Sequence, residues 1–193
     1  YPSGVDHFLE NKTLPDGPYA VAANGTCYSK EKQGFMPAII IDYYNQRRVV
    51  KDKMLNVDSE YQKNKTAQLA TQITQLSNRQ MAIKILLNSL YGALGNSYFR
   101  YYDLRIAEGI TLSGQLAIRW AEKAVNKTMR NILKTSSDYV IAIDTDSLYV
   151  NMSSLVSAVK PSDPVSFLDK ACQEKFEPML TRSYADMFTH MNA

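Results

Sequence analysis

The two longest stretches with helical periodicity lie in the first half of the chain. Apolar residues recur at three-and-four spacing from residue 35 to about Leu55, after a Gly34-Phe35-Met36-Pro37 break whose proline favours a helix start. A second such stretch covers residues 66–94 and ends at Gly95-Asn96. Residues 56–65 between them are mainly polar. The pattern predicts two long antiparallel helices with residues 56–65 as their connection.

Two other segments have the apolar, β-branched composition of paired strands. Residues 19–28 predict a hairpin, since Asn24-Gly25 favours the positive φ values of a type I′ turn. Residues 139–143 and 148–150 predict a second hairpin. Asp144-Thr145-Asp146-Ser147 lies between them, so this second hairpin has an acidic tip.

Helical periodicity returns in the second half of the chain. Residues 110–133 predict a third long helix, and residues 165–191 a fourth, with Pro178 as a kink or break. Residues 97–102 are aromatic and fit a strand or a turn. Long helices together with short antiparallel strands predict an α+β fold.

The composition is that of an ordinary globular chain. Its 193 residues are 45% hydrophobic, enough for a core without disulfide or metal crosslinks. No run approaches about 18 apolar residues, which excludes a helical membrane span. Cys27 and Cys172 lie far apart, as is common in a reducing compartment. Because the chain has no initiator Met, signal peptide or closing feature, we expect a fragment of a longer protein.

Positive charge is concentrated in the middle of the chain. Residues 30–100 hold eleven Lys/Arg and five Asp/Glu, a net charge of +6, whereas residues 1–29 carry −2 and residues 101–193 carry −1. The whole chain carries +3. A basic middle segment is typical of a protein that binds an anionic partner, and also of a solvated helical surface.

The acidic hairpin tip is the first candidate site. Asp144 and Asp146 are two residues apart, so their side chains are expected on the same side of an extended segment. Two carboxylates held together repel each other unless a cation neutralises them, and Mg²⁺ prefers oxygen ligands. Because Asp, Thr and Ser are also ordinary turn residues, a simple turn is the alternative.

A basic stripe on the two long helices is the second candidate site. Lys84, Asn88 and Tyr91 share one face of the second helix, and Arg47 and Lys51 share one face of the first. Three cations around one groove suit a triphosphate, which Arg grips as a planar fork and Lys as a point charge. The alternative is a solvated surface for the lysines and a place in the core for Tyr91.

Four motifs resemble those of family B DNA polymerases and occur in that family's order. Lys84-x-x-x-Asn88-Ser89-x-Tyr91-Gly92 is similar to the fingers motif, and Asp144-Thr145-Asp146-Ser147 resembles the palm motif. Residues 45–51 resemble the fingers helix that makes further triphosphate contacts. Residues 24–25 and 34–37 are similar to the usual lead-in to that helix.

Residues 92–96 and 99–105 look most like the replicative polymerases of T-even-like tailed phages. The resemblance implies an α+β fold with long antiparallel fingers helices and part of an antiparallel palm sheet with packed helices. Residues 1–34 would then be a palm segment with a hairpin, residues 35–96 the fingers helical hairpin, and residues 97–193 a palm segment with the Asp-Thr-Asp-Ser hairpin. The protein would be viral and act in the cytoplasm of a bacterial host.

The activity that the resemblance implies is template-directed DNA synthesis. A nucleotide passes from a dNTP to a primer 3′-hydroxyl with two Mg²⁺ ions. Asp146 would ligate the ions and Asp144 would tune the field beside them, while one further carboxylate ligand lies outside this chain. The implied partners are primer-template DNA, dNTP and, through parts not in this chain, a sliding clamp; no membrane is implied. The chain alone is expected to be inactive.

The resemblance also assigns residues that bind the nucleotide. The triphosphate-binding positions are Arg47, Lys51 and Lys84. Asn88 would order the fingers side of the pocket, and Tyr91 and Gly92 would shape the pocket for the nascent base pair.

The chain departs from the family pattern in several places. Ile143 stands where the family often has glycine before the acidic tip. The family's first metal motif, Asp-x-x-Ser-Leu-Tyr-Pro-Ser, is absent from the sequence. Tyr1-Pro2-Ser3 could be its tail, although Gly4-Val5-Asp6 follows where the family has an isoleucine pair. The proofreading exonuclease and the thumb have no counterpart here.

Two rival functions remain open from the sequence. One is a non-catalytic helical nucleic-acid-binding module, in which the acidic tip is a turn and no divalent ion is needed. The other is a metal-dependent nuclease that uses Asp144 and Asp146. The basic stripe argues against the nuclease, because a nuclease has no need of a triphosphate site.

Overall fold

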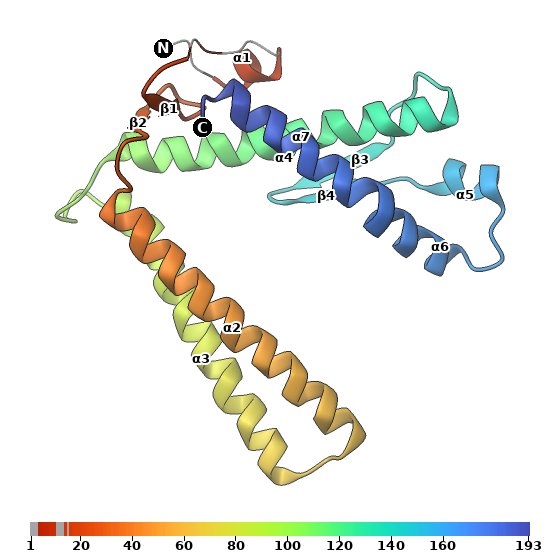
Figure 1. Ribbon diagram of the computed structural model, residues 1–193, viewed down its shortest axis with the longest axis horizontal. Coiled ribbons are helices and arrows are strands. Elements are labelled where there is room, and N and C mark those ends of the chain that lie inside the picture. The colour runs from red at the N-terminus through yellow and green to blue at the C-terminus, as the bar shows by residue number, and fades with distance from the viewer. Residues whose placement is uncertain (1–3, 11–13, 15) are drawn as a thin grey trace. The chain divides into compact units, whose positions relative to one another are not determined.

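Figure 1 shows the computed structural model of the chain, which describes residues 4–10, 14 and 16–193. It divides into two compact units: the mixed unit, Tyr1–Lys30 with Glu108–Ala193, and the helical unit, Glu31–Ala107. The expectation that Tyr1-Pro2-Ser3 ends a metal motif falls outside the described residues. In the described part of the chain, no helix is both long and apolar enough to cross a membrane.

A hairpin of two long helices makes up most of the helical unit (Figure 1). Helix α2 spans Phe35–Lys63 and helix α3 spans Ala67–Leu94. The prediction that residues 56–65 connect the two helices is therefore wrong for most of that segment. Val57 is buried and Tyr61 is half-buried, so the apolar stripe of α2 continues through these residues and keeps them helical.

The two helices of this hairpin pack along a seam with coiled-coil spacing. On each helix a shielded position recurs after four and then three residues, the spacing that lets the side chains of two antiparallel helices interlock. The seam positions are Tyr43, Arg47, Val50, Met54, Val57 and Tyr61 on α2, and Leu69, Ile73, Leu76, Gln80, Ile83, Leu87, Leu90 and Leu94 on α3. Arg47 and Gln80 are the polar side chains that stand out in this set.

An aromatic turn follows α3 and leads into α4, which spans Leu104–Leu133. Residues 97–102 form turns rather than a strand. Helix α4 starts before the predicted Ile110 because Asp103 caps it: the Arg105 backbone N–H donates to Asp103 Oδ1 at 3.0 Å, and Arg105 Nη2 donates to Oδ2 at 2.7 Å. The side-chain hydrogen bond from Arg105 is the main cause that lowers the pKa of Asp103.

The first hairpin of the mixed unit forms in the predicted place but with a different turn. Its antiparallel strands are β1, Tyr19–Val21, and β2, Cys27–Ser29. A type I′ turn needs positive φ at both Asn24 and Gly25, and of these two Gly25 alone has it, at 83°. Asn24 Oδ1 accepts the Thr26 N–H at 3.2 Å, so the side chain closes a longer turn and the type I′ prediction is wrong.

Helix α4 supplies side chains to both hydrophobic cores of the mixed unit. The first core consists of Phe8, Leu9, Leu14, Val21, Ala23, Leu116, Trp120, Met187 and Met191. The second core consists of Val125, Met129, Tyr139, Leu155 and Phe176. Leu116 and Trp120 of α4 therefore lie in the first core, and Val125 and Met129, two turns further on, lie in the second. Helix α1, Val5–Leu9, packs into the first core through Phe8 and Leu9.

The C-terminal segment is one helical run rather than a helix broken at Pro178. Helix α5, Ser153–Val159, precedes this run, which consists of α6, Pro164–Ala171; the π-helical turn η1, Cys172–Phe176; and α7, Glu177–His190. The Glu177 N–H donates to the carbonyl of Cys172, five residues earlier. This wider turn precedes Pro178, which has no N–H of its own and whose ring would crowd a normal helix, so the run continues without a break.

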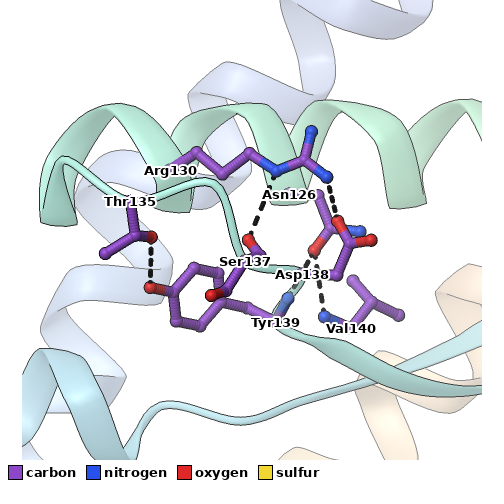
Figure 2. A network of polar contacts seen from close by, with 7 residues as sticks. All are labelled: Asn126, Arg130, Thr135, Ser137, Asp138, Tyr139 and Val140. Carbon is purple, nitrogen blue, oxygen red and sulfur yellow. Dashed lines mark hydrogen bonds and ion pairs between the residues drawn. The ribbon is translucent and has the colours of Figure 1, made fainter.

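A network of polar contacts fixes the second hairpin to α4 (Figure 2). This hairpin consists of β3, Val140–Asp144, and β4, Ser147–Val150, as the sequence predicts. Asn126 of α4 is buried, and its Oδ1 accepts the N–H groups of Tyr139 at 2.8 Å and Val140 at 3.0 Å. Arg130, one turn further along α4, forms an ion pair with Asp138. The start of β3 is thereby held on α4, and the α+β architecture predicted from the sequence is confirmed.

We predict that Asn126→Ala will loosen the second hairpin. The change leaves two shielded backbone N–H groups without an acceptor, which should lower the free energy of local opening by about 2 kcal/mol. Hydrogen exchange of the peptide that contains Tyr139 and Val140 measures this opening. The control is Asn131→Ala, an exposed position on the same helix, which should leave exchange unchanged. Equal protection of this peptide from exchange in Asn126→Ala and Asn131→Ala would contradict the role of Asn126 in holding β3 on α4.

Candidate active site

The acidic tip lies at the turn between β3 and β4. Asp144 pairs with Ser147 across the hairpin, so Thr145 and Asp146 form a two-residue loop. Leu148 and Val150 pack against the second core. Because Asp144 alternates with Ile143, the partner of Leu148, it lies on the opposite, solvent-facing side of the hairpin. Asp144 and Asp146 are both exposed and sit on either side of Thr145.

Thr145 adopts a backbone conformation that its side chain disfavours. Its φ is 52°, in the left-handed region, which is rare for a β-branched residue. A two-residue hairpin loop requires positive φ at its first central position, and here neither glycine nor asparagine occupies it. Such a residue stores about 1–3 kcal/mol of strain. The acidic tip is therefore a tight turn in which the strained backbone of Thr145 lies between Asp144 and Asp146.

Hydroxyl groups orient both carboxylates of the tip. Thr145 Oγ1 donates to Asp144 Oδ1 at 3.1 Å, and Ser147 Oγ donates to Asp146 Oδ1 at 3.3 Å. Among the described residues, no Lys, Arg or His forms an ion pair with either carboxylate. Two exposed carboxylates without a neutralising partner leave a negative charge of about two at the end of the hairpin.

The tip suits a divalent ion as part of a site. Its donors are all oxygen, they are exposed, and they face solvent where phosphate oxygens or water could complete the coordination of Mg²⁺. Within residues 4–10, 14 and 16–193, no three His, Cys, Asp or Glu side chains gather closely enough to hold a metal ion. Asp144 and Asp146 therefore offer two carboxylates at this tip, and the described residues place no third such ligand beside them.

The basic stripe lies on the α2–α3 hairpin. Residues equally far from Lys65, in the middle of the connection, lie at the same level on the two antiparallel helices. Arg47 is 18 residues from Lys65, and Lys84 is 19 residues from it, so these two lie at one level. Lys51 lies about one turn closer to the connection, and Asn88 lies about one turn further away.

Helix geometry also places these residues on one side of the hairpin. In an antiparallel pair of right-handed helices, the residues that directly follow seam positions project to the same side of the pair. Lys51, Lys84 and Tyr91 each follow a seam position directly: Val50, Ile83 and Leu90. Both lysines are exposed, and Tyr91 is 46% exposed. A Cβ added to Gly92 would meet nothing within 4 Å, so this position is open to close approach within the described chain.

Arg47 is the one site residue that lies within the seam. Its Nε is shielded from solvent and has no hydrogen-bond partner in the described part of the chain. Gln80, across the seam on α3, has its Oε1 in the same situation. A shielded polar atom without a partner costs about 1–3 kcal/mol. Gln80 was not among the sequence candidates, although a glutamine at a seam position of an otherwise hydrophobic heptad pattern is a detectable signal.

The acidic tip and the basic stripe belong to different compact units. Asp144 and Asp146 lie in the mixed unit, whereas Arg47, Lys51 and Lys84 lie in the helical unit. Within each unit the sequence-predicted residues lie close together: the two carboxylates at one turn, and Lys51 and Lys84 on one side of one hairpin with Arg47 in its seam. Each cluster has the charge opposite to the other, as metal binding and phosphate binding require.

The known proteins that this chain resembles all belong to one kind of enzyme. Residues 7–162 match DNA polymerase family B. The DNA-directed DNA polymerases of Escherichia phage RB69 and Enterobacteria phage T4 are 31% and 30% identical, each over 92% of this chain and 25% of its own length. The DNA polymerase alpha catalytic subunit of Dictyostelium discoideum is 32% identical over 63% of this chain and 7% of its own length. The chain thus spans about a quarter of the length of the two phage polymerases.

The matched residues include the whole α2–α3 hairpin and the β3–β4 hairpin. Both candidate clusters therefore lie inside the region that is shared with the family. The extent of the match and the identity to the phage polymerases lead to one conclusion: this chain belongs to DNA polymerase family B.

Proposed function

We propose that this chain carries the nucleotide-binding residues and part of the metal-binding residues of a template-directed DNA polymerase that replicates phage DNA. The observation that carries the proposal is that Lys51 and Lys84 lie on one side of the α2–α3 hairpin, with Arg47 in the adjoining seam, in a member of this family. The reaction joins the primer 3′-oxygen to the α-phosphorus of a dNTP and releases pyrophosphate.

The three cations of the hairpin bind the triphosphate. A dNTP carries about four negative charges, and charge-assisted hydrogen bonds to phosphate oxygens are among the stronger protein interactions. The Arg47 guanidinium contacts two oxygens at once, whereas Lys51 and Lys84 act as compact point charges. Asn88 orders the same side of the pocket, one turn beyond Lys84.

Tyr91 and Gly92 contact the new base pair. The half-exposed ring of Tyr91 offers a flat face, and the open surface at Gly92 allows a base to approach the backbone. These contacts depend on shape rather than charge. They would therefore favour a correctly paired nucleotide without recognising one particular base.

The acidic tip holds the metal ions of the reaction. Mg²⁺ bound there would supply positive charge beside the phosphate group that is transferred. Asp146 ligates the ions and Asp144 tunes the field beside them, with their carboxylates oriented by the hydroxyls of Ser147 and Thr145. The strained loop holds Asp144 and Asp146 next to each other. One further carboxylate ligand comes from outside this chain, so the chain alone is expected to be inactive.

In the terms used for this family, we assign residues 35–96 to the fingers and residues 1–34 and 97–193 to the palm. The partners that follow are primer-template DNA and dNTP, with a sliding clamp bound through parts not in this chain. The identity to two phage polymerases supports a viral protein that acts in the cytoplasm of a bacterial host.

Asp146→Asn in the complete encoded protein is expected to abolish polymerisation while preserving DNA binding. The amide cannot supply the negative charge that a metal ion requires, so single-nucleotide incorporation should fall by about 10³-fold. Primer extension measures the first effect and a gel-shift assay the second. Asp169→Asn, an exposed carboxylate on α6, is the matched control and should polymerise normally. Normal synthesis by the Asp146 variant would favour the non-catalytic binding module.

Lys84→Ala should weaken dNTP binding more than it slows the chemical step. Losing a charge-assisted contact to phosphate should raise the apparent dNTP dissociation constant by about tenfold. Single-turnover incorporation at varied dNTP concentration separates this constant from the maximal rate. The control is Lys53→Ala, which removes the same charge from an exposed position that the seam spacing places on the other side of α2. Equal effects of the two changes would argue against a phosphate contact at Lys84.

A further inference from the structure

The seam of the α2–α3 hairpin contains two complementary polar atoms that lack partners. Arg47 Nε is a hydrogen-bond donor and Gln80 Oε1 is an acceptor. Each has less than 1 Å² of exposed surface, and neither has a hydrogen-bond partner among the described residues. Since shielded polar atoms are nearly always paired in native proteins, two orphans in one seam require an explanation.

The two residues occupy adjacent levels of the seam. Val50 and Gln80 are each 15 residues from Lys65, so they lie opposite each other. Arg47 lies one helical turn from Val50 on α2. Long side chains at adjacent seam levels can reach each other through rotation about their own torsions, without any change in the helices.

Arg47 and Gln80 lie next to the side of the hairpin that carries Lys51 and Lys84. Lys51 is four residues after Arg47, and Lys84 is four residues after Gln80. Residues four apart on a helix lie on the same face, one above the other. Gln80 therefore lies one turn from Lys84 on the same face of α3, and Arg47 lies one turn from Lys51 on the same face of α2.

We propose that Gln80 is a positioning residue for Arg47, a role that rests on the proposed binding of triphosphate by Arg47. In the nucleotide-bound state the Arg47 Nε–H donates to Gln80 Oε1. This bond satisfies both orphan atoms and fixes the plane of the guanidinium. The two terminal amino groups of Arg47 stay available for phosphate oxygens, which they contact as a fork.

A purely structural role for Gln80 predicts a different behaviour. A hydrophobic residue would fill this seam position at least as well, because the neighbouring seam residues, Leu76 and Ile83, are hydrophobic. Methionine has nearly the shape and the helix propensity of glutamine but no strong acceptor. Gln80→Met should therefore preserve or raise the melting temperature of the protein while it removes the proposed acceptor for the Arg47 Nε–H.

The experiment compares Gln80→Met with the wild type in the complete encoded protein. We expect the apparent dNTP dissociation constant to rise by about tenfold, equivalent to about 1.4 kcal/mol, with the maximal incorporation rate within about twofold of wild type. Gln75→Met, the same change at an exposed position on α3, should have no effect. Gln80→Glu keeps an acceptor at this position and should bind dNTP within about threefold of wild type.

The Arg47→Ala background distinguishes the possible failures. If Gln80 acts through Arg47, Gln80→Met should have no further effect on dNTP binding once Arg47 is absent. Unchanged dNTP binding in Arg47→Ala alone would overturn the proposed phosphate role of Arg47. Weakened binding in Arg47→Ala with normal binding in Gln80→Met would overturn the positioning role and leave the proposed function standing. A lower melting temperature in Gln80→Met, with slower incorporation, would identify Gln80 as a structural residue.

Discussion

Burial of one face of α4 holds the mixed unit together. The helix has 30 residues and is about 45 Å long, and its apolar side chains enter both cores in turn. The two hairpins of this unit are placed by that helix: the first packs into the first core through Val21, and the second is held by Asn126. The position of the acidic tip is therefore determined by the contacts of β3 and β4 with α4 and the second core. A rigid support of this kind is what paired carboxylates need if they are to bind a metal ion in a defined geometry.

Much of this fold follows from local sequence patterns, and the predictions that were wrong failed for local physical reasons. Helical periodicity located α2, α3 and the C-terminal run, and the apolar segments on either side of Asp144 located the second hairpin. The polar composition of residues 56–65 suggested a loop, but Val57 and Tyr61 keep the seam spacing and extend the helix. The Asn24-Gly25 pair suggested a type I′ turn, but the Asn24 side chain bonds to Thr26 instead. In each case a tertiary or side-chain contact outweighed the average preference of the local sequence.

The candidate site was predictable to the extent that its chemistry is carried by residue type and spacing. Charged residues at four-residue spacing and two Asp residues across one Thr can be read directly from the sequence. The left-handed backbone of Thr145 could not be, because no residue with a preference for that conformation marks the position. Gln80 was missed because its significance depends on Arg47, which lies at the adjacent level of the seam on the other helix. That relation becomes visible once the two helices are aligned about Lys65.

The π-helical turn η1 determines the rotational phase of the C-terminal run. Phe167 and Leu168 of α6 and Met179 and Leu180 of α7 all pack against the second core, although each pair lies twelve residues from the other. At about 100° per residue, a regular α-helix would turn the two pairs about 120° apart. The extra residue within η1 takes up about 100° of this rotation, so both pairs face the same core. Deletion of a single residue from η1 would therefore give a regular α-helix that keeps both pairs on the second core, whereas regular α-helical winding of all its residues would turn α7 and Met187 by about 100°.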